Sequence, residues 1–180
     1  ITPSMAKRQS LKELQERLAQ RLSVARSEAV AATWLAIESG GRRFLLPLVQ
    51  SGEIFPVAPV QRVPYTKGWF VGVANLRGGL NGVVDLAQLM GLAAPADASE
   101  RTTSESRLIS LHAALGLNAV LWIDRLLGLR SPGQFSAIED RSTEDPPFIT
   151  RALVDSQGQR WQEIDLQQLV SEPGFLSIAA

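Results

Sequence analysis

The chain of 180 residues contains an internal repeat. A stretch that begins at Phe70 is matched by a second stretch that begins at Phe148, with a two-residue shift near the turn. Within the repeat, Asp85-Leu-Ala-Gln-Leu89 and Asp165-Leu-Gln-Gln-Leu169 align without a gap. A repeat of this length favours two similar lobes over one large sheet.

Short apolar runs separated by Gly- and Pro-rich turns predict that both lobes are built from strands. Residues 34–38 and 44–49 flank a Gly-Gly turn, and residues 108–111 and 117–123 flank a turn at Gly116. Residues 70–76 form a further strand, which ends at Arg77-Gly-Gly79. We also expect a strand over 53–57, a short one at 83–84, a short helix over 86–90 and a polar loop over 140–147. This pattern is typical of small barrels or sandwiches.

A helix is expected before the first strand. Ser10 and Glu13 have the spacing of a capping box, which predicts a helix start at Ser10. Leucines then recur at helical spacing, at positions 11, 14, 18 and 22. Such a stripe either packs on the body of the protein or docks on a partner, and we favour packing because most amphipathic helices cover a core.

These segments predict a domain organisation. Residues 1–31 form an N-terminal helical extension, and residues 32–175 form the main domain. Lobe 1 covers about 32–91 and lobe 2 about 106–170. Residues 92–105 between the lobes are small and polar, and they are read as a linker.

Composition excludes several classes of protein. Lys and Arg (18) balance Asp and Glu (18), and no basic stripe is visible, so a nucleic-acid binder is not expected. The absence of cysteine excludes disulfides, thiolate nucleophiles and Cys-ligated metals. The single histidine, His112, lacks the partners of a triad or a zinc site, and we expect no metal or cofactor. No apolar run approaches the roughly 20 residues of a membrane span, which predicts a cytoplasmic protein without membrane insertion.

The repeated aspartates allow two interpretations. Asp85 and Asp165 could share a proton as a catalytic dyad in a small β-barrel hydrolase. Each is followed by Leu, however, rather than by the small hydroxyl-bearing turn that such a dyad needs. Each also has a Gln three residues later, Gln88 and Gln168, as in a capping box. We therefore favour Asp85 and Asp165 as structural N-caps.

Arg77 is the other candidate functional residue. It follows Asn75 and Leu76 at the end of a strand and precedes Gly78 in a Gly-Gly turn. An arginine on a rigid turn is a good anchor for an interface, because its planar guanidinium forms bidentate contacts. It could equally pair with a carboxylate of its own chain, and composition does not separate these alternatives.

The stretch from Trp69 to Leu86 resembles the central signature of CheW-like domains. In that family an Asn-Leu-Arg-Gly motif, here Asn75 to Gly78, leads into Val-Val-Asp-Leu, here Val83 to Leu86. The similarity extends over roughly residues 33–170. The N-terminal helix and the residues around Asn75 look most like the adaptors of type IV pilus (twitching motility) systems. The resemblance implies two intertwined, five-stranded SH3-like barrels without enzyme activity.

The resemblance also implies partners. CheW-like adaptors bind the regulatory domain of a CheA-type histidine kinase and the cytoplasmic tip of methyl-accepting chemoreceptors. The positions that match partner-binding residues of the family are Glu53, Ile54, Asn75, Leu76, Arg77 and Gly78. The implied function is an adaptor recruited to membrane-associated chemosensory arrays. Flagellar chemotaxis adaptors and regulatory modules of the kinase itself are the alternatives within the family.

Overall fold

The computed structural model describes residues 4–31, 33–93 and 101–177. The chain divides into two units, residues 1–32 and residues 33–180, which are described separately. Residues 94–100, the middle of the predicted linker, lie outside the described part. No helix among the described residues is long and apolar enough to cross a membrane.

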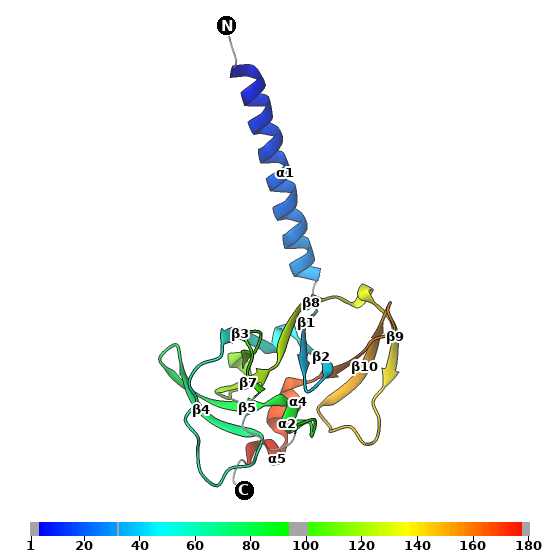
Figure 1. Ribbon diagram of the computed structural model, residues 1–180. Helices are drawn as coiled ribbons and strands as arrows, with labels where there is room; N and C mark the ends of the chain where they lie inside the picture. Colours follow the sequence, from blue (N-terminus) through cyan, green and yellow to red (C-terminus); the bar gives the residue numbers. More distant parts are fainter. Residues whose placement is uncertain (1–3, 32, 94–100, 178–180) are drawn as a thin grey trace. The chain divides into compact units, whose positions relative to one another are not determined.

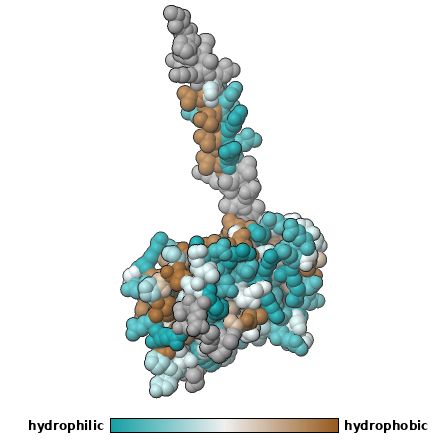
Figure 2. Space-filling view, in the orientation of Figure 1, coloured by the Kyte–Doolittle hydropathy of each residue, from teal (hydrophilic) through white to brown (hydrophobic). Residues whose placement is uncertain are grey.

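The first unit contains one helix, α1 (Ser4–Ala31). At 1.5 Å per residue, its 28 residues span about 42 Å. The predicted start at Ser10 is wrong, because the helix already includes Ala6, Lys7 and Arg8, which all favour helix. Leu11, Leu14, Leu18 and Leu22 are 50–62% exposed and form a continuous apolar stripe along the helix (Figure 2). Packing of this stripe on the body stays a prediction.

The second unit consists of two sheets and short helices (Figure 1). Sheet A comprises β1 (Trp34–Ser39), β2 (Arg42–Pro47), β8 (Arg125–Arg130), β9 (Phe135–Asp140), β10 (Ile149–Asp155) and β11 (Arg160–Ile164). Sheet B comprises β3 (Ser51–Pro56), β4 (Phe70–Leu76), β5 (Gly79–Asp85), β6 (Arg107–Leu111) and β7 (Ala119–Ile123). The helices are α2 (Leu86–Leu89), α4 (Leu166–Ser171) and α5 (Pro173–Leu176), with 3-10 turns η1 (Leu48–Gln50), η2 (Ala113–Leu115) and η3 (Pro132–Gln134).

The two halves of the sequence exchange strands. Sheet A has the order β8-β1-β2-β11-β10-β9, and sheet B has the order β3-β6-β7-β5-β4. Sheet A therefore contains the hairpin β1–β2 from the first half and its remaining strands from the second half. Sheet B contains the hairpin β6–β7 from the second half and its remaining strands from the first half. Four strand pairs join the halves: β1 with β8 and β3 with β6 are antiparallel, and β2 with β11 and β5 with β7 are parallel. The predicted lobes, 32–91 and 106–170, thus describe halves of the sequence rather than halves of the structure.

The two sheets follow the same plan. The order β8-β1-β2-β11-β10 in sheet A corresponds, strand by strand, to the order β3-β6-β7-β5-β4 in sheet B. Sheet A has a sixth strand, β9. In sheet B its place on β4 is taken by Gln61, which exchanges two backbone hydrogen bonds of 2.8 Å with Val73. The fold class expected from the sequence, mainly β with intertwined lobes and an added helix, is confirmed.

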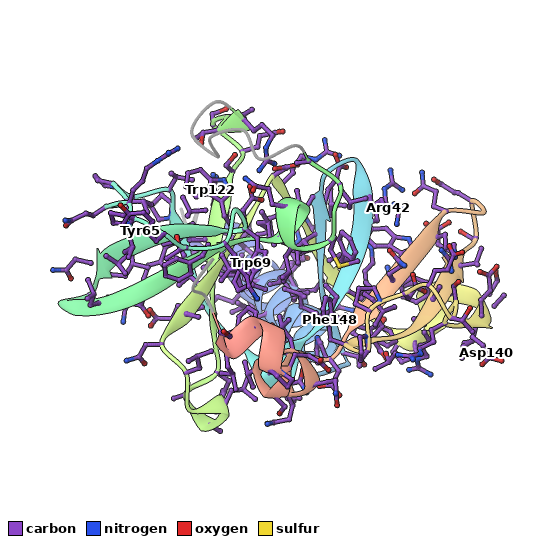
Figure 3. The ribbon with its side chains drawn as sticks, turned by 90° about the horizontal axis from the view of Figure 1, so that it is seen from below. Arg42, Tyr65, Trp69, Trp122, Asp140 and Phe148 are labelled. Carbon is purple, nitrogen blue, oxygen red and sulfur yellow. The ribbon has the colours of Figure 1, made fainter. Side chains whose placement is uncertain are left out.

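The structural repeat differs from the sequence alignment by one residue. The Asp85 N–H donates to the carbonyl of Trp69, and the Asp165 N–H donates to the carbonyl of Phe148, both at 2.8 Å. Phe148 therefore corresponds to Trp69 rather than to Phe70. Both aromatic residues lie in the middle of the body, between Tyr65 on the sheet B side and Asp140 on the sheet A side (Figure 3).

Three apolar clusters give the body its layers. The central cluster lies between the sheets and includes Leu35, Phe44, Ile109 and Leu121. Alternate residues of the same strands face two outer clusters, such as Leu45 in sheet A and Val120 in sheet B. Because β1, β2, β6 and β7 are buried on both faces, they read as continuous apolar runs without alternation.

Two strands were not recognised in the sequence. Residues 121–129, which resemble a single second-half strand of the family, form the end of β7 and most of β8, and these lie in different sheets. β9 was missed because nearly all its residues are exposed and it lacks an apolar periodicity.

The shared central cluster makes a prediction about unfolding. Leu121 is fully buried in it, so Leu121→Ala should lower the free energy of unfolding by about 2–5 kcal/mol. The body should still unfold in a single transition, because neither sheet keeps its inner face covered without the other. Urea titrations followed by circular dichroism measure both quantities. Leu80→Ala, at a side chain 65% exposed, is the control and should change stability by about 0.5 kcal/mol at most. Two separate transitions would contradict the prediction.

Candidate functional site

The turn between β4 and β5 places Arg77 at its tip. Leu76 pairs with Gly79, so that Arg77 and Gly78 form a two-residue hairpin loop. Their φ angles are +50° and +73°, as a type I′ turn requires of both central residues. Glycine adopts such angles freely, whereas an arginine incurs a conformational cost on the order of 1 kcal/mol. The fold thus holds a non-glycine residue where glycine would be the more stable choice.

Glu53 is the partner of Arg77 within the chain. Arg77 Nη1 lies 2.8 Å from Glu53 Oε1, and both side chains are largely exposed, at 74% and 48%. Glu53 belongs to β3 and Arg77 follows β4, which are the two opposite edges of sheet B. The sheet is therefore curled until its edges meet, as in a small barrel.

An irregularity in β3 fixes the position of Glu53. The pairing of β3 with β6 shifts register between Ser51 and Ile54. Within this bulge the Glu53 N–H donates to the hydroxyl of Ser110 at 2.7 Å instead of to a strand carbonyl. A Cβ at Gly52 would lie 2.4 Å from the same hydroxyl oxygen, so only glycine fits at this close approach. Bulges commonly re-aim a side chain in this way.

The structure brings most of the expected partner-binding residues to one surface. Glu53, Ile54, Asn75, Arg77 and Gly78 are exposed, with Ile54 at 42%. Leu76 differs, because it is 9% exposed and packs in the outer cluster of sheet B. It supports the turn from inside. The exposed Leu80, opposite Asn75 in the β4–β5 ladder, extends the surface and was not among the expected residues.

Asp85 and Asp165 lie at equivalent places at the starts of α2 and α4. The Asp85 carboxylate accepts a hydrogen bond from the Ala87 N–H, and the Asp165 carboxylate accepts from the N–H groups of Gln167 and Gln168. Gln50 also donates to Asp165, at 2.9 Å. Each carboxylate thus has its own set of partners, and the hydrogen bonds are those of helix N-caps.

Asp85, which is buried, belongs in addition to an ionic cluster whose other members are partly exposed. The guanidinium of Arg101 pairs with its carboxylate and lies 3.4 Å from Asp124 Oδ1. Asp124 also accepts a hydrogen bond of 2.8 Å from the Gly40 N–H in the β1–β2 turn. The cluster therefore ties the ends of both sheets together. Sequence reasoning missed Arg101, because nothing in the polar segment around it marks a residue that pairs with a buried carboxylate.

Burial raises the pKa of Asp85 above its ordinary value of 3.8, against the opposing effect of Arg101 and the cap hydrogen bonds. The folded state therefore holds this proton more tightly than the unfolded chain does. The stability linked to this group is fully present below the unfolded pKa and is lost as pH rises through the folded pKa. Arg101 limits that loss by stabilising the ionised carboxylate.

No other candidate chemistry emerges. Among the described residues, no group of three or more His, Asp or Glu side chains could hold a metal ion. His112 is exposed, and its Nδ1 accepts a hydrogen bond of 3.1 Å from the Ala114 N–H at the start of η2. It therefore caps a turn.

Arg101→Ala tests the ionic cluster. It leaves the Asp85 carboxylate buried without its cation, which should cost about 3 kcal/mol at neutral pH. The loss should shrink toward acidic pH, where Asp85 becomes protonated, and grow as pH rises. Urea unfolding over about pH 5 to 8 measures this dependence. The double variant Arg101→Ala/Asp85→Asn should recover much of the loss, because Asn still caps the helix. A pH-independent loss, or no recovery in the double variant, would count against the cluster.

Comparison with known proteins places the chain in a family. Residues 33–174 match the model of the CheW-like domain. Protein PilI of Pseudomonas aeruginosa is 28% identical over 162 residues, which cover 86% of this chain and 85% of PilI. The crystal structure of the scaffolding protein TtCheW from Thermoanaerobacter tengcongensis has the same fold, with a TM-score of 0.63 and 20% identity, and the match covers 80% of this chain and 95% of TtCheW. The chain belongs to the CheW-like domain family.

Proposed function

We propose that this chain is a non-catalytic adaptor that couples methyl-accepting chemoreceptors to a CheA-type histidine kinase. The observation that carries the proposal is the Arg77 turn. Its arginine is exposed, occupies a conformation that favours glycine, and lies in the motif that marks partner contacts in the family. Strain kept at an exposed position is a reason to look for function there.

The surface around Arg77 suits a protein partner. A guanidinium held on a rigid hairpin loses little conformational freedom on binding, and it offers a planar array of donors to a carboxylate or carbonyl. Ile54, Asn75 and Leu80 beside it supply apolar contact area and one side-chain amide. We assign the receptor contact to this surface.

The edges of the two sheets offer a matching pair of apolar contacts. Ile54 on β3 and Leu129 on β8 occupy equivalent edge positions and are 42% and 43% exposed. The kinase's regulatory domain is of the same family, so similar edges on both proteins can bury against one another. Two such edges on each molecule would allow alternating assembly.

Coupling in this scheme needs no chemistry at the adaptor. An adaptor that binds one conformational state of the receptor or kinase more tightly shifts the population toward that state. Differential binding of about 1–3 kcal/mol is typical of allosteric coupling. The hydrogen bonds of Asp85 and Asp165 with their own helices favour a structural role for both over a proton-sharing pair.

The relationship to PilI supports assignment to a type IV pilus (twitching motility) pathway, because the similarity covers most of both chains. In that setting the protein would be cytoplasmic and recruited to membrane-associated arrays through its partners. A flagellar adaptor and a regulatory module of the kinase are the alternatives. A pull-down from a bacterial lysate distinguishes them: recovery of a pilus-system kinase supports the proposal, and recovery of only flagellar chemotaxis proteins contradicts it.

Two substitutions separate the binding role of Arg77 from its structural role. Arg77→Ala keeps the unfavourable turn geometry, whereas Arg77→Gly relieves it. Both should weaken binding to a receptor cytoplasmic fragment by about tenfold or more. Both should change the free energy of unfolding by only about 1 kcal/mol, because the pair with Glu53 is exposed. Titration calorimetry and urea unfolding measure these effects.

Arg141→Ala is the matched control, since it removes an exposed arginine from a loop at the other end of the body. It should leave receptor binding unchanged. Wild-type receptor binding and kinase activation by a folded Arg77→Ala protein would refute the assignment.

A further inference from the structure

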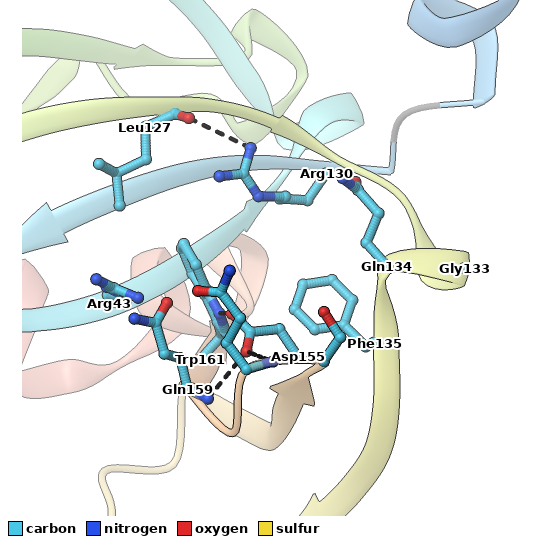
Figure 4. A pocket seen from close by; sticks show the side chains of 11 residues that line it. Arg43, Leu127, Arg130, Gly133, Gln134, Phe135, Asp155, Gln159 and Trp161 are labelled. Carbon is cyan, nitrogen blue, oxygen red and sulfur yellow. Dashed lines mark hydrogen bonds between the residues drawn. The ribbon is translucent and has the colours of Figure 1, made fainter.

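A cavity opens at one end of sheet A (Figure 4). It has a volume of about 590 Å³, and its walls come from β8, η3, the start of β9 and the β10–β11 turn. Arg43, Arg130 and Phe135 line it around Trp161. In sheet B the two edges are bridged by Arg77 and Glu53, but the equivalent turn of sheet A carries the uncharged Ser156 and Gln157.

Two guanidinium groups flank the indole of Trp161. The Cζ atoms of Arg43 and Arg130 lie 5.4 Å and 5.5 Å from the centre of its ring, so they are at most about 11 Å apart. Arg130 is held in place, because its Nη1 donates to the carbonyls of Leu127 and Leu129. Arg43 and Arg130 lie on different sides of the lining, and the Arg130 guanidinium is turned toward Leu127 (Figure 4).

A second cavity of about 500 Å³ adjoins the first and shares Arg43 and Gln159 with it. It adds Arg42, Arg160 and Gln162 to the lining. We call the two cavities together the arginine groove. Residues 33–180 contain 12 Lys and Arg and 15 Asp and Glu. Among those that the structure describes, four arginines and one carboxylate, Asp155, line this groove. The positive charge is therefore concentrated against an acidic background.

The carboxylate in the groove is largely engaged by its own turn. Asp155 accepts hydrogen bonds from the N–H groups of Gln157 and Gln159, both at 2.9 Å, and from the indole N–H of Trp161 at 3.1 Å. Arg160 pairs with Glu139 at 2.9 Å. In the described part of the chain, Arg42, Arg43 and Arg130 have no carboxylate within ion-pair distance.

One buried acceptor in the groove also lacks a partner. Gln162 is 3% exposed, and its Nε2 donates to Asp145 at 3.2 Å. Its Oε1 is buried and accepts no hydrogen bond from the described residues. An unpaired buried acceptor costs about 1–3 kcal/mol.

We propose that the arginine groove binds an extended acidic segment of a partner protein, whose carboxylates contact the guanidinium groups of Arg43 and Arg130. The charge selects the acidic side chains, since guanidinium groups bind carboxylates through paired hydrogen bonds. The length of two adjoining cavities and the amides of Gln157, Gln159 and Gln162 suit a peptide backbone better than a single small anion. The site is separate from the Arg77 surface and does not depend on the receptor assignment.

The probe for this site is a fluorescein-labelled decapeptide of alternating Glu and Ser, with a matched peptide of Gln and Ser as control. Fluorescence anisotropy should show saturable binding of the Glu peptide that weakens as salt is added, because exposed charges are screened. Arg43→Gln and Arg130→Gln should each weaken it by about tenfold. Arg141→Gln removes the same charge outside the groove and should have no effect, and circular dichroism confirms that each variant is folded.

Three outcomes would overturn the proposal. The first is equal affinity for the Glu and Gln peptides. The second is an equal loss of affinity for the Glu peptide in Arg43→Gln and Arg141→Gln. The third is displacement of the peptide by millimolar inorganic phosphate, which would mark a site for small anions. The Arg77→Ala variant should bind the Glu peptide as tightly as the unsubstituted protein. Failure of the arginine-groove proposal is therefore distinguishable from failure of the adaptor assignment.

Discussion

The fold depends on the apolar cluster that the two sheets share. Each half of the sequence supplies a hairpin to one sheet and its remaining strands to the other, and the parallel pairs β2–β11 and β5–β7 join them. Leu35 and Phe44 from sheet A and Leu121 and Ile123 from sheet B meet in this one cluster. Neither hairpin is covered on both faces without strands from the other half. The body is therefore one cooperative unit, and both candidate surfaces lie on a rigid support.

Duplication provides two equivalent barrel ends, and their loops make them different. In sheet B the two-residue turn presents Arg77, which reaches Glu53 and bridges the sheet edges. In sheet A the corresponding turn is longer by one residue and carries Ser156 and Gln157, so the end stays open and exposes a cavity over Trp161. Loops diverge more freely than the strands that support them. A repeated scaffold thus supports two unlike surfaces for binding.

The sequence predicted features that have local signals. The repeat, the hairpins, the caps at Asp85 and Asp165 and the Arg77 turn each follow from residues near one another in the chain. The exchange of strands between the halves has no such local signal. The same apolar runs would be buried whether each half kept its hairpin in its own sheet or gave it to the other sheet. Arg101 and the arginine groove were missed for a related reason. Arg43, Arg130 and Trp161 are far apart in sequence, and only the closure of sheet A brings them together.

The pairing of Arg77 with Glu53 has a consequence for binding. Because the pair is exposed and screened by solvent, it stabilises the fold little, but it orients the guanidinium before a partner arrives. A partner carboxylate that replaces Glu53 would find the donors in place and would restrict few additional side-chain rotations. The strained turn also limits the conformational freedom lost on binding, because the β4–β5 ladder already fixes φ of Arg77 at +50° before a partner binds. In the proposed contact, selectivity then rests on the geometry of a turn that the β4–β5 ladder fixes.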